Sequence, residues 1–195
     1  MKKQISFGQY RIIDLMILTV LMAASMILIH IAAGQWFQDQ LYVVSPVAIV
    51  TALVMMRWSG WAALPALVGG LLYAGLAHGN WHHYLIYGGG NLLSVAALLI
   101  FRVSGKEQIR ANSILTMAYA LCVQLLMLLG RGGVALLLGY DPSICIRFIT
   151  MDLLSCLFTV VVIWIARRVE GLFEDQKHYL LRIDRERQEE GREQF

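Results

Sequence analysis

Charged side chains are scarce in this sequence, and their scarcity excludes an ordinary soluble domain. They make up 15% of the 195 residues, whereas hydrophobic residues make up 58%. Soluble domains carry about a quarter charged residues. Between Ile12 and Ala166 only eleven side chains are charged, and most of the others lie in residues 167–195. We therefore predict a membrane-embedded, substrate-binding domain at residues 1–166 and a charged cytoplasmic tail at residues 167–195.

Cysteine is also rare, and the usual signatures of catalysis are missing from the sequence. Cys122, Cys145 and Cys156 have no paired spacing, so they predict neither a disulfide framework nor a zinc site. The sequence has no G-x-S-x-G elbow, no H-E-x-x-H helix and no phosphate-binding P-loop. The net charge of +3 is too small to indicate nucleic acid as a partner. We predict a protein that is not an enzyme, uses no cofactor or metal, and cannot couple ATP hydrolysis to transport by itself.

Long apolar runs are abundant by contrast. A helix needs about 20 residues to cross the ~30 Å hydrocarbon core of a bilayer, and it satisfies its own backbone hydrogen bonds there. We predict an all-α bundle of about six transmembrane helices, at residues 12–33, 41–56, 61–77, 84–101, 113–129 and 146–166. The second and third runs are short and could instead form one hydrophobic hairpin with a tight turn at residues 57–60.

The distribution of lysine and arginine predicts the orientation of the bundle, because basic loops stay on the cytoplasmic side. Basic residues occupy the amino end, the turn after the second run, the loop after the fourth run and the carboxyl tail. The opposite loops, residues 34–40 and 78–83, contain no lysine or arginine. Both termini are therefore predicted to be cytoplasmic. Arg131 and Arg147 are the exceptions, since they lie on the predicted outer side.

The loops predicted to face outward are rich in groups that recognise small organic molecules. Their aromatic and polar candidates are Trp36 in the first loop, Asn80, Trp81, His82, His83 and Tyr84 in the second, and Tyr140 in the third. Aromatic rings with a few hydrogen-bonding groups are typical of a ligand pocket. The tryptophans could equally belong to the aromatic belt at the membrane interface. The histidines lack a neighbouring carboxylate or cysteine, so we expect them to be solvated or to contact a ligand rather than a metal.

Ionisable side chains inside or near the spans are the second group of candidates. Arg131 and Arg147 could extend to lipid headgroups, or they could hold a carboxylate or phosphate of a ligand. Asp152 lies within the sixth apolar run, and an intramembrane ionisable residue indicates a functional site by default, with Arg147 or Arg131 as its partner. A purely structural ion pair is an equal alternative. Asn91 is expected either to form a hydrogen bond between helices or to face the same pocket.

Two further patterns concern packing. Small residues repeat at helical spacing in the third run, at Ala62, Ala66, Gly70 and Ala74. Such a stripe allows helices to approach closely, and we predict internal packing, with a docking face for another membrane subunit as the alternative. The tail after Ala166 carries both signs of charge around an apolar stripe. It predicts either an amphipathic helix on the cytoplasmic surface or a simply solvated helix.

Three stretches of the membrane core carry a family resemblance. They run from Ser45-Pro46 through Arg57-Trp58-Ser59-Gly60-Trp61 to Gly69-Gly70, along Tyr87-Gly88-Gly89-Gly90-Asn91-Leu92-Leu93, and from Asp152-Leu153-Leu154 to Arg167-Arg168. With the size and topology, these stretches resemble the substrate-binding S components of energy-coupling factor (ECF) vitamin importers. The resemblance implies six helices, both termini inside, and a micronutrient site at the outer face. It also implies separate ATPase and scaffold subunits. Ligand contacts are expected from the outer loops and from the outer halves of the last three helices, where Tyr87 and Asn91 lie.

We therefore predict a multi-pass protein of the bacterial plasma membrane that captures a small micronutrient for an ECF-type importer. Its predicted partners are the ligand, a transmembrane scaffold subunit, ATPase subunits and the bilayer. The arginines and aromatic residues indicate an anionic or heterocyclic ligand. The alternative is a structural or regulatory six-helix membrane protein that acts through its charged tail.

Overall fold

The computed structural model describes residues 6–36 and 44–193, and the regular structure in these ranges is entirely helical. Four helical stretches in this part of the chain are long and apolar enough to cross a bilayer: Phe7–Gln35, Val47–Leu76, Trp81–Ser104 and Ser113–Leu137. A shorter apolar helix, Leu153–Ala166, follows them. The prediction of an all-α membrane bundle is confirmed.

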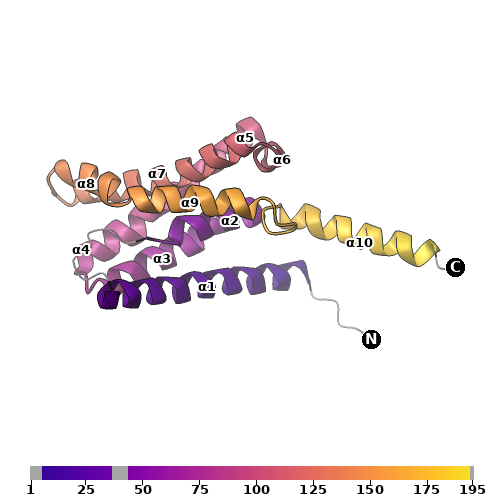
Figure 1. The fold of residues 1–195 in the computed structure, drawn as a ribbon, viewed down its shortest axis with the longest axis horizontal. Helices are drawn as coiled ribbons and strands as arrows, with labels where there is room; N and C mark the ends of the chain where they lie inside the picture. The colour runs from indigo at the N-terminus through magenta and orange to yellow at the C-terminus, as the bar shows by residue number, and fades with distance from the viewer. Residues whose placement is uncertain (1–5, 37–43, 194–195) are drawn as a thin grey trace.

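The bundle is elongated and has two distinct ends (Figure 1). Helix α1 (Phe7–Trp36) runs along the length of the bundle, and its first residues lie at the same end as the carboxyl-terminal helix α10 (Gln176–Glu193). A hydrogen bond from the Tyr10 hydroxyl to the side chain of Gln176, at 3.4 Å, joins the two segments. We call this end the basic end, because it carries Arg57, Lys106 and Arg110; the other we call the pocket end. This is the end that the distribution of basic residues in the sequence predicts to be cytoplasmic.

The second and third apolar runs fold back on each other as a hairpin. Helix α2 (Val47–Trp58) is followed by the short 3₁₀ helix η1 (Ser59–Ala62) and by α3 (Ala63–Leu76). A Cβ built on Gly69 would lie 2.7 Å from the methyl groups of Val47, so residues on either side of the turn are packed together. Ser59 takes a positive φ of 52° at the turn. Every residue of α2 is buried, which makes α2 the central helix of the bundle.

The small-residue stripe on the third run is used for packing inside the bundle. Ala62, Ala66 and Ala74 are fully buried, and Gly70 is buried with them. A Cβ on Gly70 would collide with the backbone carbonyl of Tyr87 in the next helical segment. The prediction of internal packing is therefore confirmed for these four positions.

The fourth apolar run is helical but irregular. It comprises α4 (Trp81–Tyr84), the π-helical turn η2 (Leu85–Gly89), the 3₁₀ segment η3 (Leu92–Ala97) and α5 (Leu98–Ser104). π-helical turns inside helices frequently occur at functional sites. After Gly105, which has a φ of +70°, the short helix α6 (Lys106–Ala111) lies at the basic end.

The fifth run is longer than predicted. Helix α7 extends from Ser113 to Leu137, so the prediction that it ends at Leu129 is wrong, and Arg131 lies within a helix rather than in a loop. Glycine is a poor helix former, which suggested a helix end at Gly130. Close packing against the fourth run overrides this preference, because Gly130 lies directly against the carbonyl of Gly90.

The predicted single sixth helix is also incorrect, because it is interrupted at Asp152. Helix α8 (Ser143–Met151) ends there and α9 (Leu153–Ala166) begins. Asp152 has φ −95° and ψ 11°, outside helical geometry, and its side chain is bonded to Arg131 on α7. The break separates α8, which lies at the pocket end, from the shorter apolar helix α9 (Figure 1).

The predicted tail begins in contact with the bundle and then leaves it. Phe173 is fully buried, with its ring 6.2 Å from that of Tyr119 on α7. Ion pairs from Lys106 to Asp175, at 2.6 Å, and from Arg110 to Glu174, at 2.5 Å, hold the same segment against α6. Helix α10 then projects beyond the bundle (Figure 1).

Candidate ligand-binding site

A cavity of about 250 Å³ lies at the pocket end of the bundle. Helices α3, α4, η2, α7 and α8 contribute to its wall, together with the loop before α8 and the break after it. The cavity is lined by Tyr73, His83, Ile86, Tyr87, Arg131, Tyr140, Ile144, Arg147, Phe148, Met151 and Asp152. Mixed aromatic, apolar and charged side chains of this kind are typical of small-molecule sites.

Arg131 is the buried centre of a polar network in the cavity wall. Its side chain is only 5% exposed, and its Nη1 donates to Oδ2 of Asp152 at 2.8 Å. Its Nε donates to Oδ1 of Asn91 at 2.7 Å. Asn91 in turn donates from Nδ2 to the carbonyl of Ala66 at 3.1 Å. The network therefore joins α3, the fourth run, α7 and the α8–α9 break. A buried charge is stable only when an ion pair and hydrogen bonds of this kind compensate for the loss of water.

Glycine residues bring the network together. A Cβ on Gly90 would lie 2.6 Å from the backbone of Arg131, and one on Gly130 would strike the carbonyl of Gly90. A Cβ on Gly132 would lie 2.7 Å from the sulfur of Cys145. The fourth run, α7 and α8 therefore cross at backbone contact distance, as small residues permit in membrane bundles. This contact places Arg131 within reach of Asn91.

The aromatic part of the wall is built around Tyr87. Its ring centroid lies 4.6 Å from that of Tyr73 and 6.0 Å from that of Phe148, with the Phe148 ring nearly perpendicular at 85°. The ring of His83 is almost parallel to that of Tyr87, at 9° and 6.4 Å. The guanidinium carbon of Arg131 lies 5.0 Å from the centroid of Tyr87, within the range of a cation–π interaction.

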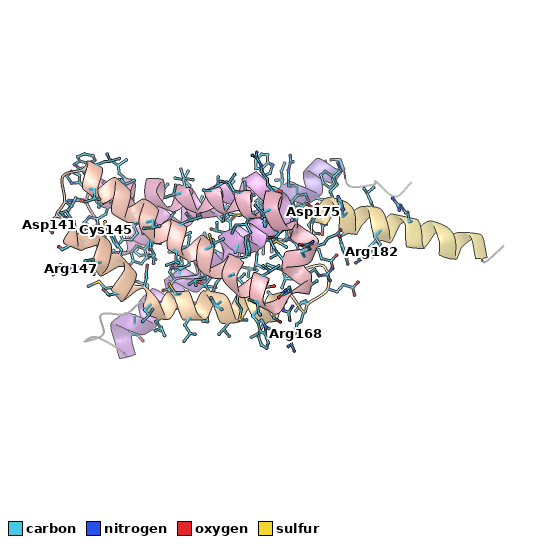
Figure 2. The ribbon with its side chains drawn as sticks, turned by 90° about the horizontal axis from the view of Figure 1, so that it is seen from above. Asp141, Cys145, Arg147, Arg168, Asp175 and Arg182 are labelled. Carbon is cyan, nitrogen blue, oxygen red and sulfur yellow. The ribbon has the colours of Figure 1, made fainter. Side chains whose placement is uncertain are left out.

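Arg147 differs from Arg131 in its surroundings. It lines the cavity from α8 but is exposed, and no ion pair of its side chain occurs among the described residues. Figure 2 shows Arg147 with Cys145 and Asp141 at one end of the molecule, opposite Arg168 and Arg182. An exposed, unneutralised guanidinium at a cavity is suited to hold a carboxylate or phosphate.

The charges of the cavity sum to one positive charge. Arg131 and Asp152 neutralise each other, and Arg147 remains, with His83 taken as neutral. Asp141 lies nearby in the loop before α8, but it does not line the cavity. Its carboxylate accepts the backbone N–H of Ser143 at 2.8 Å, and this hydrogen bond lowers the pKa of Asp141.

Six of the twelve residues predicted to bind the ligand line the cavity: His83, Tyr87, Arg131, Tyr140, Arg147 and Asp152. Asn91 lies behind the wall and holds Arg131. Asn80 has a local role, because its side chain caps α4 and bonds Nδ1 of His83 at 2.7 Å. It therefore orients a ring of the wall without lining the cavity itself.

The remaining candidates lie away from the cavity lining. Trp81 is 63% exposed and stacks on His82, whose ring meets the edge of Tyr140 at 6.0 Å. Tyr84 is also exposed. Trp36 is the last residue of α1, and its side chain falls outside the described part of the chain, as do the loop residues 37–40. The exposed rings Trp81 and Tyr84 fit the alternative of an interfacial belt.

Five lining residues were not predicted from the sequence: Tyr73, Ile86, Ile144, Phe148 and Met151. A signal for three of them was present, because Ile144, Phe148 and Met151 follow each other at spacings of four and three residues. Together with Arg147 they define one face of a helix. The partnership of Tyr73 with Tyr87 depends on the packing of α3 against η2, which has no sequence signature.

Metal chemistry has no support in this part of the molecule. Across residues 6–36 and 44–193, no group of three or more histidine, cysteine, aspartate or glutamate side chains is placed to hold a metal ion.

Comparison of the chain with protein-family models, curated proteins and solved structures yields no match. The geometry of the cavity is therefore the basis for the functional conclusion.

Proposed function

We propose that this protein is the substrate-capturing membrane subunit of an ECF-type importer in a bacterial plasma membrane. It binds a small, vitamin-like micronutrient at the outer face and depends on separate scaffold and ATPase subunits for energy. The observation that carries the proposal is the cavity at the pocket end, which combines an aromatic wall with Arg147, an arginine that has no ion pair among the described residues.

The position of the cavity supports capture from outside. It lies opposite the end that holds Arg57, Lys106 and Arg110, which the positive-inside rule assigns to the cytoplasm. The absence of a P-loop from the sequence means that this chain would need a partner to use ATP. A separate energy-coupling module supplies that function in this proposal.

The test is isolation of the tagged full chain from its native membrane, followed by identification of the proteins that remain bound. The proposal predicts that a second multi-pass membrane protein and P-loop ATPase subunits copurify. It also predicts that uptake of the ligand by proteoliposomes requires internal ATP and these subunits. Ligand binding with uptake that is independent of any ATPase would contradict the importer assignment.

A structural or regulatory role is the second candidate, favoured by the arrangement of the tail. The segment at Phe173–Asp175 is fixed to the basic end by burial and ion pairs, and α10 projects away from the bundle. This arrangement would suit a helix presented to a cytoplasmic partner. Deletion of residues 177–195 distinguishes the two roles: the importer proposal predicts unchanged ligand affinity, whereas the regulatory role predicts loss of a bound cytoplasmic protein.

A further inference from the structure

We infer that the cavity selects a small planar aromatic or heterocyclic compound with a single carboxylate. The carboxylate is held by Arg147, and the ring lies against Tyr87 and Phe148. This inference rests on the proposal that the cavity binds a small molecule, and it specifies the chemical class of that molecule.

The anion belongs at Arg147 because Arg131 is already occupied. Asp152 takes Nη1 of Arg131 at 2.8 Å, and Asn91 takes its Nε at 2.7 Å. A ligand acid at Arg131 would have to compete with a carboxylate that is part of the protein. Arg147 lines the cavity with no such competitor among the described residues, and two parallel hydrogen bonds to one carboxylate are the favoured geometry of a guanidinium.

The charge balance favours one negative charge on the ligand. The formal charge of the lining is +1, because Arg131 and Asp152 cancel. A neutral ligand would leave Arg147 unpaired within the complex, and a cation would face it directly. A dianion would place its second charge near Asp152, which is only 17% exposed. A monoanion therefore pairs with Arg147 without a second charge near the partly buried Asp152.

The wall favours a flat ring. The ring of Tyr87 packs against Tyr73, at a centroid distance of 4.6 Å, and against Phe148, at 6.0 Å, so its orientation is held from two sides. His83 is nearly parallel to Tyr87 and is fixed by Asn80 through its Nδ1. Aromatic faces and edges fixed in this way pair with another ring in stacked or edge-to-face geometry. Branched or flexible aliphatic ligands gain no such contact.

The volume sets the size of the compound. Cavities for drug-sized ligands measure about 300–1,000 Å³, and this one measures about 250 Å³. One or two fused rings with a short acid arm are in proportion to this space. The headgroup of an anionic lipid shares the negative charge, but it has no ring to place against Tyr87 and Phe148.

The experiment compares matched acids and amides on the detergent-purified full chain. The probes are pyridine-3-carboxylate, benzoate and indole-3-acetate, each with its neutral amide, and binding is followed by thermal shift and calorimetry. We expect at least one acid to bind and its amide to bind about 10-fold or more weakly, because a charge-assisted hydrogen bond is lost. Phosphatidylglycerol added to the micelles serves as the lipid arm, and we expect it to leave the affinity of the acid unchanged.

Two variants of Arg147 test whether this residue causes the preference for acids over amides. Arg147→Gln should remove the preference for the acid over the amide, and Arg147→Lys should restore part of it. Arg168→Gln is the matched control, because Arg168 is exposed at the opposite end, against Trp164. The control should bind the acid as the unmodified protein does.

Four outcomes would overturn the inference. Amides could bind as well as acids, the preference could survive in Arg147→Gln, or phosphatidylglycerol could displace the acids. Binding of none of the acids, when a broad micronutrient screen finds a neutral or cationic binder, also overturns the chemical class. In that last case the capture function stands. Failure of the scaffold and ATPase subunits to copurify would instead remove the importer role and leave the ligand class intact.

Discussion

At the scale of single residues, the contact between Arg131 and Asp152 indicates that these two side chains stabilise the fold rather than bind the ligand. Both were candidates for the ligand site from the sequence, because ionisable groups in apolar spans are costly. The structure pairs them with each other at 2.8 Å and completes the pair with Asn91. The pair therefore stabilises the crossing of α7 with the α8–α9 break. In the proposed site it is Arg147, which has no ion pair among the described residues, that holds the carboxylate of the ligand.

Replacement of Arg131 by Met should lower the free energy of unfolding by about 3–5 kcal/mol, because Asp152 would keep its charge without a partner. Chemical denaturation in detergent micelles measures this loss. The double variant Arg131→Met with Asp152→Leu removes both charges and should recover much of the stability. A single variant as stable as the unmodified protein, or a double variant no better than the single one, would show that the pair is not what stabilises the crossing.

From the sequence, the ion-pair partner of Asp152 could be predicted to be Arg131 or Arg147, but the two could not be distinguished. Arg131 and Arg147 both lie on the predicted outer side, the same side as the start of the sixth run that contains Asp152. The choice depends on Gly90 and Gly130, whose contact turns Arg131 toward Asn91 and Asp152. Likewise Tyr73 could not be recognised as a lining residue, since only the fold brings it to Tyr87.

At the scale of helices, the position of the site depends on how closely the fourth run approaches α7. Gly130 lies against the carbonyl of Gly90, whereas Gly133, one turn further along α7, has nothing within 4 Å of where its Cβ would be. Gly130 and Gly133 therefore allow the same substitution to be compared at a packed and at an open position of one helix.

Gly130→Ala should be destabilising by about 1–3 kcal/mol, because the added methyl group overpacks the crossing. Gly133→Ala should be neutral or stabilising by up to about 1 kcal/mol, because alanine is the better helix former and the space is open. Thermal unfolding of both variants provides the comparison. Equal effects of the two substitutions would contradict the close crossing.

Helix α8 depends on Asp141 at its start. The carboxylate accepts the N–H of Ser143, which lowers the pKa of Asp141 below its usual value of 3.8. A lowered pKa in the folded state means that the stabilisation is complete above the usual value and is lost as the pH falls through the lowered one. We therefore expect amide exchange in α8, corrected for intrinsic rates, to be constant from pH 5 to 8 and faster below about pH 4.

Asp141→Ala should increase exchange in α8 at pH 7, because no side chain would then accept the Ser143 N–H. Asp141→Asn keeps an acceptor and serves as the control. Unchanged exchange in the alanine variant would show that the start of α8 is held by other contacts.

The helical class and most of the apolar segments could be predicted from hydropathy alone, because lipid leaves helices as the form that such runs adopt. The ends of helices could not. Gly130 is helical because tertiary packing outweighs its low propensity, and the sixth run is broken because Asp152 is drawn to Arg131. Both differences from the prediction occur next to the cavity, where tertiary contacts outweigh the local helix propensity of the sequence.

At the scale of the whole molecule, the two ends of the bundle are built differently. The pocket end has a cavity with an aromatic wall, whereas at the basic end ion pairs and the buried ring of Phe173 hold the first part of the tail against the bundle. Arg57 adds to this attachment, because it binds both oxygens of Asp14 and donates to the carbonyl of Gly171 at 2.5 Å. The first part of the tail is therefore integral to the bundle.

Phe173→Ala should lower the free energy of unfolding by about 3–5 kcal/mol, because the ring is fully buried next to Tyr119. Leu181→Ala on α10, where the side chain is 50% exposed, is the control and should change it little. Denaturation of the two variants, with proteolysis of the tail as a second readout, tests whether Phe173 fixes the tail to the bundle. A Phe173 variant with unchanged stability and protease resistance would place the tail outside the folded bundle.

The most direct test of the account is a thermal-shift screen of three proteins against vitamins, nucleobases and related cofactors. The proteins are the unmodified chain, Ile144→Trp, which fills the cavity, and Ile146→Trp, which adds the same bulk to the exposed side of α8. At 100-fold above its dissociation constant a ligand adds about 2.7 kcal/mol of apparent stability. We predict one strong hit on the unmodified chain and on Ile146→Trp, and none on Ile144→Trp. No hit on folded, unmodified protein, or an equal hit on Ile144→Trp, would contradict a ligand site in this cavity.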